Sequence, residues 1–245
     1  MIQLIKRIIV LIFCVLLLTS LTSSIVIAAT DSAIDTSAAN YGYVTIDYEE
    51  EVNLAKMKVG ITFNNKTTYY NYQANQKLSY PFSNGNGVYT ISLYKNIRGT
   101  KYKTIETATI NVKLYNELSP YLVSTYDARF TKGDLVDTIT KSICKNSITD
   151  KAKVNLIYNF VHKNIKYDYD FAKKISEKEI TNHIPSPIAT IKYNKGICYD
   201  IASLFAAMCK TQNIPCYIVK GYYNGVSHAW NNVYIDSHWY KIDAG

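Results

Sequence analysis

The spacing of apolar residues changes near Ser119-Pro120 of the 245-residue chain, and this change sets the expected fold class. Between residues 41 and 116 apolar residues tend to occupy every second position, whereas beyond residue 134 they recur every three or four positions. Period two is typical of half-buried strands, and a period near 3.6 is typical of amphipathic helices. We therefore expect an α+β protein in which an all-β domain comes first.

The first of these segments, residues 41–116, is expected to form a small β-sandwich of immunoglobulin-like type. Asn84-Gly85-Asn86-Gly87 and the stretch from Asn96 to Gly99 supply turns, because Asn and Gly accept positive φ at little cost. Several short strands separated by such turns favour a sandwich. No residue here carries chemistry, so we expect a spacer or binding module. The strands are marked by alternating sets at Val44–Ile46–Tyr48, Val59–Ile61–Phe63, Leu78–Tyr80–Phe82, Tyr89–Ile91–Leu93 and Ile110–Val112–Leu114.

Residues 1–29 have the organisation of a signal peptide. Lys6 and Arg7 precede an apolar run from Ile8 to Leu18, and small residues follow, with cleavage expected near Ala28 or Ala29. The run is shorter than the roughly 20 apolar residues that a spanning helix needs. An uncleaved anchor is the alternative. Either way we expect an exported protein, secreted or held at the cell surface.

Small polar residues over 30–40 are expected to be a linker. The formal net charge is +8, spread without a dense Lys/Arg run, which argues against nucleic-acid binding and favours a solvated basic surface. Such a surface would be attracted weakly to an anionic cell wall or membrane. The expected partner is a peptide or protein substrate, with cell-wall peptide as one candidate.

Residues 117–245 are expected to form the second domain. Helices are predicted over Asp134 to Lys145 and over Asp150 to Asn164, the latter capped at Thr149-Asp150. Pro185 and Pro187 interrupt the chain before the next segment.

Cys198 is placed to act as a nucleophile. An amphipathic pattern at Ile201, Leu204, Phe205 and Met208 predicts a buried helix that begins at or just before it. The unpaired N–H groups and dipole of a helix start favour a thiolate, and the same N–H groups could hold an oxyanion. Gly196 would let the backbone approach a substrate closely.

A three-stranded antiparallel meander is expected after this helix. Its strands run from Cys216 to Tyr223, Val226 to Ile235 and His238 to Asp243, with turns at 224–225 and 236–237. That register pairs Trp230 with Asp243, so His228 and Asp243 become diagonal neighbours on one face. Asp243 could then hold one imidazole nitrogen and leave the other to serve Cys198, which is a nucleophile–base–orienter set.

The second half of the chain resembles the transglutaminase-like superfamily. The segments that carry this resemblance are Gly-Ile-Cys-Tyr-Asp-Ile-Ala-Ser-Leu-Phe (196–205), Asn-Ile-Pro-Cys-Tyr-Ile-Val-Lys-Gly (213–221), His-Ala-Trp-Asn (228–231), Trp-Tyr-Lys-Ile-Asp (239–243) and Asn-Ile-Lys-Tyr-Asp (164–168). It implies a papain-like α+β core and a thioester formed at the cysteine. By position Cys198 matches the nucleophile, His228 the general base and Asp243 the residue that orients it.

The roles of several further residues near these motifs can be interpreted in two ways. Trp230 could line the acyl site or belong to the core. Tyr167 and Tyr169 could supply an oxyanion-hole hydroxyl, as an upstream aromatic does in the family, or could simply pack. Asp200 is expected to cap the helix that starts at Cys198, and His183 is expected at the surface or in packing. No C-x-x-C pair is present, so neither a metal nor a cofactor is expected.

Beyond the signal segment, which contains Cys14, the remaining cysteines are Cys144, Cys209 and Cys216, and they are expected to be buried thiols. With Cys198 they would also allow two disulfides in one of three pairings. The expected function is a cysteine enzyme that acts on amide bonds of peptides or proteins. Hydrolysis and transfer to an amine both remain open. The alternative is a non-catalytic surface scaffold built on an enzyme-like core.

Overall fold

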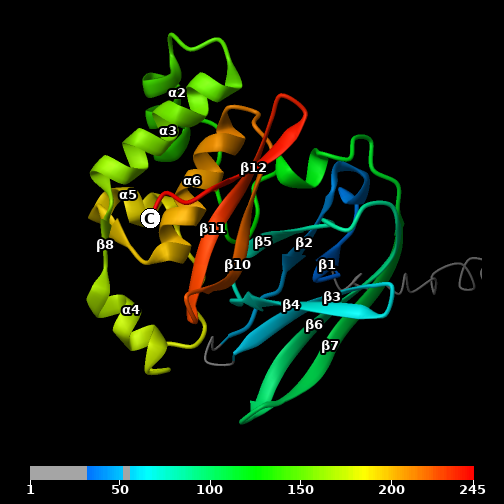
Figure 1. Ribbon diagram of the computed structural model, residues 1–245. Helices are drawn as coiled ribbons and strands as arrows, with labels where there is room; N and C mark the ends of the chain where they lie inside the picture. Colours follow the sequence, from blue (N-terminus) through cyan, green and yellow to red (C-terminus); the bar gives the residue numbers. More distant parts are fainter. Residues whose placement is uncertain (1–31, 52–55) are drawn as a thin grey trace, which may run out of the picture. The chain divides into compact units, whose positions relative to one another are not determined.

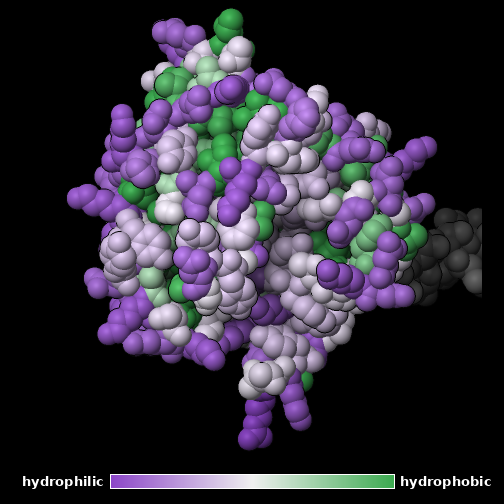
Figure 2. Space-filling model, in the orientation of Figure 1, coloured by the Kyte–Doolittle hydropathy of each residue, from purple (hydrophilic) through white to green (hydrophobic). Residues whose placement is uncertain are grey.

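The computed structural model describes residues 32–51 and 56–245, and residues 33–245 form one compact unit (Figure 1). The predicted signal over 1–29 lies outside the described residues. Within them, no helix is long and apolar enough to cross a membrane. Hydrophilic side chains cover most of the face seen in Figure 2, and hydrophobic residues are exposed there in small separate areas.

Seven strands form the first part of the chain in two antiparallel sheets. One sheet has the order β1-β2-β5 and the other the order β4-β3-β6-β7. Buried side chains of both sheets, among them Ile46 and Ile91, belong to one hydrophobic cluster. The strands are β1 (Ile34–Asp35), β2 (Tyr43–Asp47), β3 (Met57–Phe63), β4 (Lys66–Tyr72), β5 (Lys77–Pro81), β6 (Gly87–Arg98) and β7 (Lys101–Val112).

Two of these strands were not expected from the sequence. β1 pairs with β2, Ile34 opposite Ile46, so the predicted linker over 30–40 is wrong from Ala33 onward. The alternation that marks a strand needs more residues than this two-residue element has. β4 pairs along its whole length with β3, but six of its seven side chains are partly or fully exposed. β4 therefore has no apolar face, and its sequence lacks the alternating pattern that predicts a strand.

The second part of the chain is built around one buried helix, α6 (Cys198–Thr211). It is enclosed by helices on one side and by a three-stranded sheet of order β10-β11-β12 on the other (Figure 1). Leu204, Phe205 and Met208 of α6 are fully buried in the resulting core. The other elements are α2 (Leu135–Cys144), α3 (Asp150–Asn164), β8 (Lys166–Tyr167), α4 (Tyr169–Ser176), α5 (Pro187–Tyr193), β9 (Lys195–Gly196), β10 (Cys216–Tyr223), β11 (Val226–Ile235) and β12 (His238–Ile242).

The predicted register of the meander is confirmed. Ile235 lies opposite His238 and Asn231 opposite Ile242, as a two-residue turn at 236–237 requires. Asn224 and Gly225 both have positive φ, which is the geometry of a tight hairpin turn. The helix predicted over Asp150 to Asn164 is also confirmed, and the Thr149 side chain caps it by accepting from the N–H of Ala152. Helices α4 and α5 were not predicted, and Pro187 begins α5 rather than breaking the chain.

Candidate active site

Cys198 is the first residue of α6, and its place there is fixed by local geometry. The Asp200 side chain accepts a hydrogen bond from the Ile197 N–H at 3.1 Å, which caps the helix as expected. Gly196 makes this possible, since a Cβ at that position would lie 2.6 Å from the Cβ of Asp200. Real Cβ atoms do not approach so closely. The glycine is therefore required for packing against the helix start, and it is not among the residues that line the cavity described below.

The Cys198 thiol is free, half-buried and surrounded by hydrogen-bond donors. The backbone N–H groups of Ala229 and Tyr199 and the hydroxyl of Tyr167 all act on the thiol so as to lower its pKa. Burial nevertheless raises the pKa of the thiol above its usual value, and the Asp200 charge adds to this, while the three donors lower it. The N–H groups at the helix start favour the thiolate as expected, but desolvation outweighs them and the pKa of the thiol is raised overall. Formation of the thiolate therefore requires a base that takes the proton of the thiol.

His228 is held by Asp243. Nε2 of the imidazole lies 2.7 Å from Oδ2 of the carboxylate, across the neighbouring strands β11 and β12. This is the contact that the predicted register implies. With Nε2 engaged, Nδ1 is the ring nitrogen left to accept a proton. The Ala229 N–H, which directly follows His228 in the chain, acts on the Cys198 thiol and lowers its pKa, so the thiol lies near this part of β11.

Cys198 and His228 line the same cavity, which has a volume of about 700 Å³. Its walls come from α4, the loop before α5, the start of α6 and the β10–β11 hairpin, with Asn71 contributed by β4. The cavity therefore includes a residue from the β domain, which the sequence had suggested was uninvolved. The lining also includes Tyr167, His183, Tyr199 and Lys220.

The structure separates the two tyrosines that were considered for the oxyanion hole. The Tyr167 hydroxyl acts on the Cys198 thiol to lower its pKa, and Tyr167 lines the cavity. Tyr169 is 78% exposed, and it packs against the Tyr167 ring without lining the cavity. Tyr167 alone is in position to donate to a reacting oxygen at Cys198.

Trp230 does not line the acyl site either. Its ring stacks on His228 at a centroid distance of 6.2 Å and covers Gly221, the residue opposite His228 on β10. Lys241 lies over the same ring at 4.4 Å. Trp230 therefore supports the imidazole from the side and is part of the packing around the base, not of a substrate wall.

One pair of residues was missed by sequence reasoning. His183, expected at the surface or in packing, has its Nε2 2.6 Å from Oδ1 of Asp200 and lines the Cys198 cavity. Its ring packs edge-on against Phe171 and Tyr199. Fifteen residues of chain separate His183 from Cys198, and no periodic pattern spans them. The sequence therefore carried no local signal for this contact.

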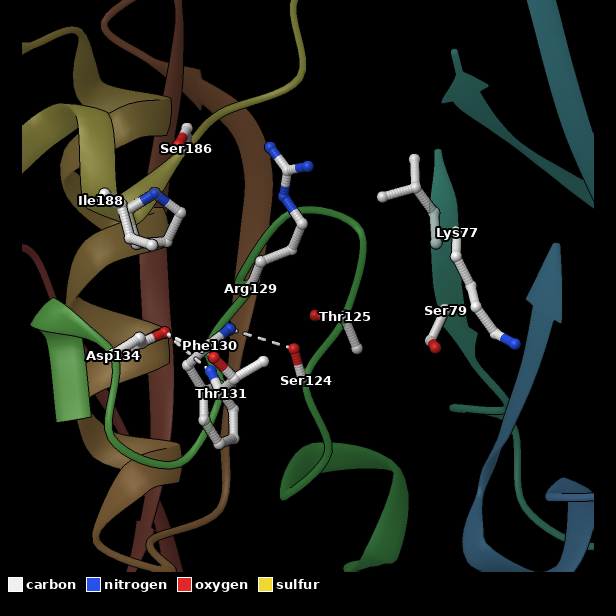
Figure 3. A pocket seen from close by; sticks show the side chains of 12 residues that line it. Lys77, Ser79, Ser124, Thr125, Arg129, Phe130, Thr131, Asp134, Ser186 and Ile188 are labelled. Carbon is white, nitrogen blue, oxygen red and sulfur yellow. Dashed lines mark hydrogen bonds between the residues drawn. The ribbon is translucent and has the colours of Figure 1, made fainter. Parts of the chain in front are cut away.

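A second cavity of about 360 Å³ lies elsewhere in the fold (Figure 3). Figure 3 shows Arg129 extending from the segment that also carries the hydrogen bond from the Phe130 N–H to the Ser124 hydroxyl. The Arg129 guanidinium donates to the Gln76 side chain and to the Pro185 carbonyl. None of its lining residues is a cysteine or histidine, so this cavity lacks a thiol nucleophile and an imidazole base.

The other cysteines are also free within the described residues. Cys144, Cys209 and Cys216 are buried thiols. This agrees with the expectation of buried thiols and not with the alternative of two disulfides. The same part of the chain contains no group of three His, Cys, Asp or Glu side chains arranged to hold a metal ion.

Residues 137–244 match the family model of the transglutaminase-like superfamily. This match covers the helices around Cys198, the meander and both His228 and Asp243. The second part of the chain is therefore a transglutaminase-like domain.

Two curated relatives are similar to part of this chain. The human kyphoscoliosis peptidase is 27% identical over 131 residues, which is 49% of this chain and 19% of that protein. A UPF0252 protein of Methanocaldococcus jannaschii is 37% identical over 101 residues, 38% of this chain and 29% of its own length. The aligned region spans less than a third of the length of either relative.

Two solved structures also resemble this chain. One described as a TGase is 26% identical, with 45% of this chain and 30% of that chain covered and a TM-score of 0.40. A candidate cysteine protease from Cytophaga hutchinsonii is 17% identical, with 83% and 71% covered and a TM-score of 0.46. With TM-scores below 0.5, these likenesses add nothing to the family match.

Proposed function

We propose that this chain is a cysteine-nucleophile enzyme that acts on amide bonds through a thioester. Cys198 is the nucleophile, His228 the general base and Asp243 the residue that orients the imidazole. The observation that carries the proposal is the 2.7 Å contact between His228 Nε2 and Asp243 beside a thiol at the start of a buried helix. The transglutaminase-like match over 137–244 supports it.

The proposed reaction begins with proton transfer. As Sγ of Cys198 attacks the amide carbon, Nδ1 of His228 takes the thiol proton, and Asp243 stabilises the imidazolium. The carbonyl oxygen becomes an oxyanion, for which the Tyr167 hydroxyl and the Tyr199 N–H are the nearest donors. Collapse breaks the C–N bond, and the leaving amine takes the proton from His228. A thioester remains on Cys198.

Water or an amine then resolves the thioester. The attacking group gives its proton to His228, the C–S bond breaks, and the sulfur recovers that proton as the thiol. Hydrolysis is the proposed outcome, since water is always present and no amine-binding feature is evident in the sequence. Incubation with a fluorescent primary amine and a glutamine-containing peptide tests this. Label in the wild type but not in Cys198→Ala would indicate transfer, while cleavage without label would indicate hydrolysis.

A non-catalytic scaffold is the second candidate, and one observation favours it. Burial raises the pKa of the Cys198 thiol, as it does for inert core cysteines. Alkylation by iodoacetamide near neutral pH separates the two functions. A scaffold predicts that Cys198 reacts no faster than a small thiol, whereas the enzyme predicts faster reaction that depends on His228.

We further propose an immunoglobulin-like sandwich for the β domain and an exported location for the protein. The strand orders β1-β2-β5 and β4-β3-β6-β7, with a shared core, support the former. The organisation of residues 1–29 supports the latter. Fractionation of cells that express the full chain tests export: the protein should be found outside the cytoplasm, and a cytoplasmic protein of full mass would contradict it.

A further inference from the structure

The cavity that contains Cys198 is lined by basic side chains and, among the described residues, by no carboxylate. Lys173, Lys220 and the two histidines His183 and His228 line it, whereas none of its described lining residues is Asp or Glu. Two further lysines, Lys56 and Lys58 of the β domain, reach it indirectly. They donate to the side chains of Thr181 and Asn71, both of which line the cavity.

The acidic residues around this cavity are already engaged. Asp200 binds His183 and the Ile197 N–H, and Asp243 binds His228. Asp127 lies behind the cavity, 3.4 Å from the Tyr199 hydroxyl. Glu177 is 3.9 Å from Lys173, a weak surface pair. No described acidic side chain therefore neutralises the centre of the cavity.

Lys220 is the cation nearest to the reactive end of this cavity. It lies on β10 directly opposite Ala229, whose N–H acts on the Cys198 thiol. Opposite residues of an antiparallel pair point to the same face, so the Lys220 side chain runs toward the start of α6. There its ammonium lies 3.8 Å from the ring centroid of Tyr199.

The ammonium of Lys220 is fixed and forms no ion pair with a described residue, while burial lowers the pKa of Lys220 and the charge of Asp127 acts in the opposite direction. The Tyr199 ring and the Tyr126 hydroxyl, at 3.3 Å, hold it in place. Within the described part of the chain it has no carboxylate within 4 Å. The residue remains solvent-accessible, so a ligand can reach the remaining N–H groups. A lysine held in this way loses little rotamer freedom when it binds an anion.

We propose that Lys220 binds a carboxylate of the acyl donor and makes the enzyme selective for anionic peptides. The inference rests on the proposed function, because it assumes that the acyl donor reacts at Cys198. The carboxylate can belong to an acidic side chain or to a free C-terminus. A charge-assisted hydrogen bond at a partly desolvated site favours the anionic ligand by about tenfold over its neutral amide.

The test uses alkylating probes that differ only in this charge. The first pair is N-iodoacetyl-glycine and N-iodoacetyl-glycinamide, which presents a terminal carboxylate or its amide. The second pair is the α-amide of N-iodoacetyl-glutamate and that of N-iodoacetyl-glutamine, which presents a side-chain carboxylate or its amide. Mass spectrometry of the Cys198 peptide gives the alkylation rate with each probe. The rate with the anionic probe is divided by the rate with its neutral partner, and this ratio is then divided by the same ratio measured for a small thiol.

Three variants complete the test. Lys220→Gln removes the charge, Lys220→Arg keeps it, and Lys145→Gln removes the same charge from an exposed site at the end of α2. The ratio should exceed one in the wild type, fall about tenfold in Lys220→Gln, and persist in Lys220→Arg and Lys145→Gln. The probe pair with the larger fall identifies which carboxylate is recognised.

Two results would overturn the inference. One is a ratio in Lys220→Gln equal to that of the wild type. The other is an equal fall in Lys145→Gln, which would indicate a general effect of net charge. The ratio is defined even where both probes react slowly. Slow reaction of both probes with the wild type would count against the proposed function, whereas fast reaction of the wild type with no preference for the anionic probe would count against the Lys220 site.

Discussion

Nε2 of His228 and Oδ2 of Asp243 lie 2.7 Å apart across adjacent strands, with the side chain of Asp243 39% exposed. The contact fixes the ring orientation and assigns Nε2 as the nitrogen that carries hydrogen when the carboxylate is ionised. It leaves Nδ1 for the Cys198 proton.

Asp243→Asn should lower turnover strongly while leaving the fold intact. The asparagine amide keeps the size of the side chain, but it can either accept a hydrogen bond from His228 or donate one to it. It therefore no longer fixes one tautomer of the imidazole, and without a charge it no longer stabilises the imidazolium. By analogy with the triad aspartate of serine proteases, a fall of about 10²- to 10⁴-fold in kcat is expected. The assay is cleavage or amine labelling of a peptide library.

Asp236→Asn is the matched control for this change. Asp236 lies in the turn between the same strands and has positive φ, which Asn accepts. It should retain activity. Equal activity of both variants would show that the Asp243 contact has no part in the reaction.

Tyr167→Phe should slow the reaction at Cys198 and leave stability nearly unchanged. The change removes only the hydroxyl that lowers the pKa of the Cys198 thiol, so this pKa should rise further and an oxyanion should lose one donor. We expect a fall of about 10- to 100-fold in kcat/KM. Tyr169→Phe removes the hydroxyl of the neighbouring exposed ring and should have no effect. Similar losses in both would exclude a specific role for Tyr167.

Gly196→Ala should destabilise the domain. Its new Cβ would meet the Cβ of Asp200 at 2.6 Å, and the Asp200 carboxylate cannot retreat without giving up the Ile197 N–H or His183. A loss of about 1–3 kcal/mol in the free energy of unfolding is expected, measured by urea denaturation. An unchanged unfolding midpoint and slope would show that the helix start can shift to accommodate the methyl group.

Cys198 should be the thiol that reacts first in the native protein. Cys144, Cys209 and Cys216 are buried, and burial raises the pKa of Cys144 and Cys209 above the usual value. Brief treatment with iodoacetamide at pH 7.5, followed by peptide mapping, should show label at Cys198 alone. After denaturation in urea, all four should react at similar rates. Native labelling at Cys209 or Cys216 would contradict the packed core around α6.

The sequence predicted those parts of the fold in which a periodic pattern extends over several turns or strands. The bounds of α3 and the pairing of Ile235 with His238 follow from apolar spacing and from turn residues with positive φ. The contact between His228 and Asp243 then follows from register alone, since a slip of one residue would have separated them.

The remaining features depend on contacts that no local pattern encodes. β4 is a polar edge strand, and β1 is two residues long. The His183–Asp200 pair joins a loop to a helix start, and the raised pKa of Cys198 reflects how deeply the tertiary fold buries it. The helix dipole could be inferred from sequence, but the desolvation that outweighs it could not.

The dependence of Cys198 alkylation on His228 and on pH tests the central claim most directly. Since burial raises the pKa of the thiol, Cys198 without a base should be protonated at neutral pH, and its thiolate fraction should grow as the pH rises toward that raised pKa. In His228→Ala the iodoacetamide rate should therefore be below that of a small thiol at pH 7 and rise about tenfold per pH unit.

In the wild type, transfer of the proton to His228 should keep the rate at neutral pH above that of a small thiol, and the rate should depend less on pH than in His228→Ala. The account predicts these two different profiles. Identical slow profiles for the wild type and His228→Ala would contradict it.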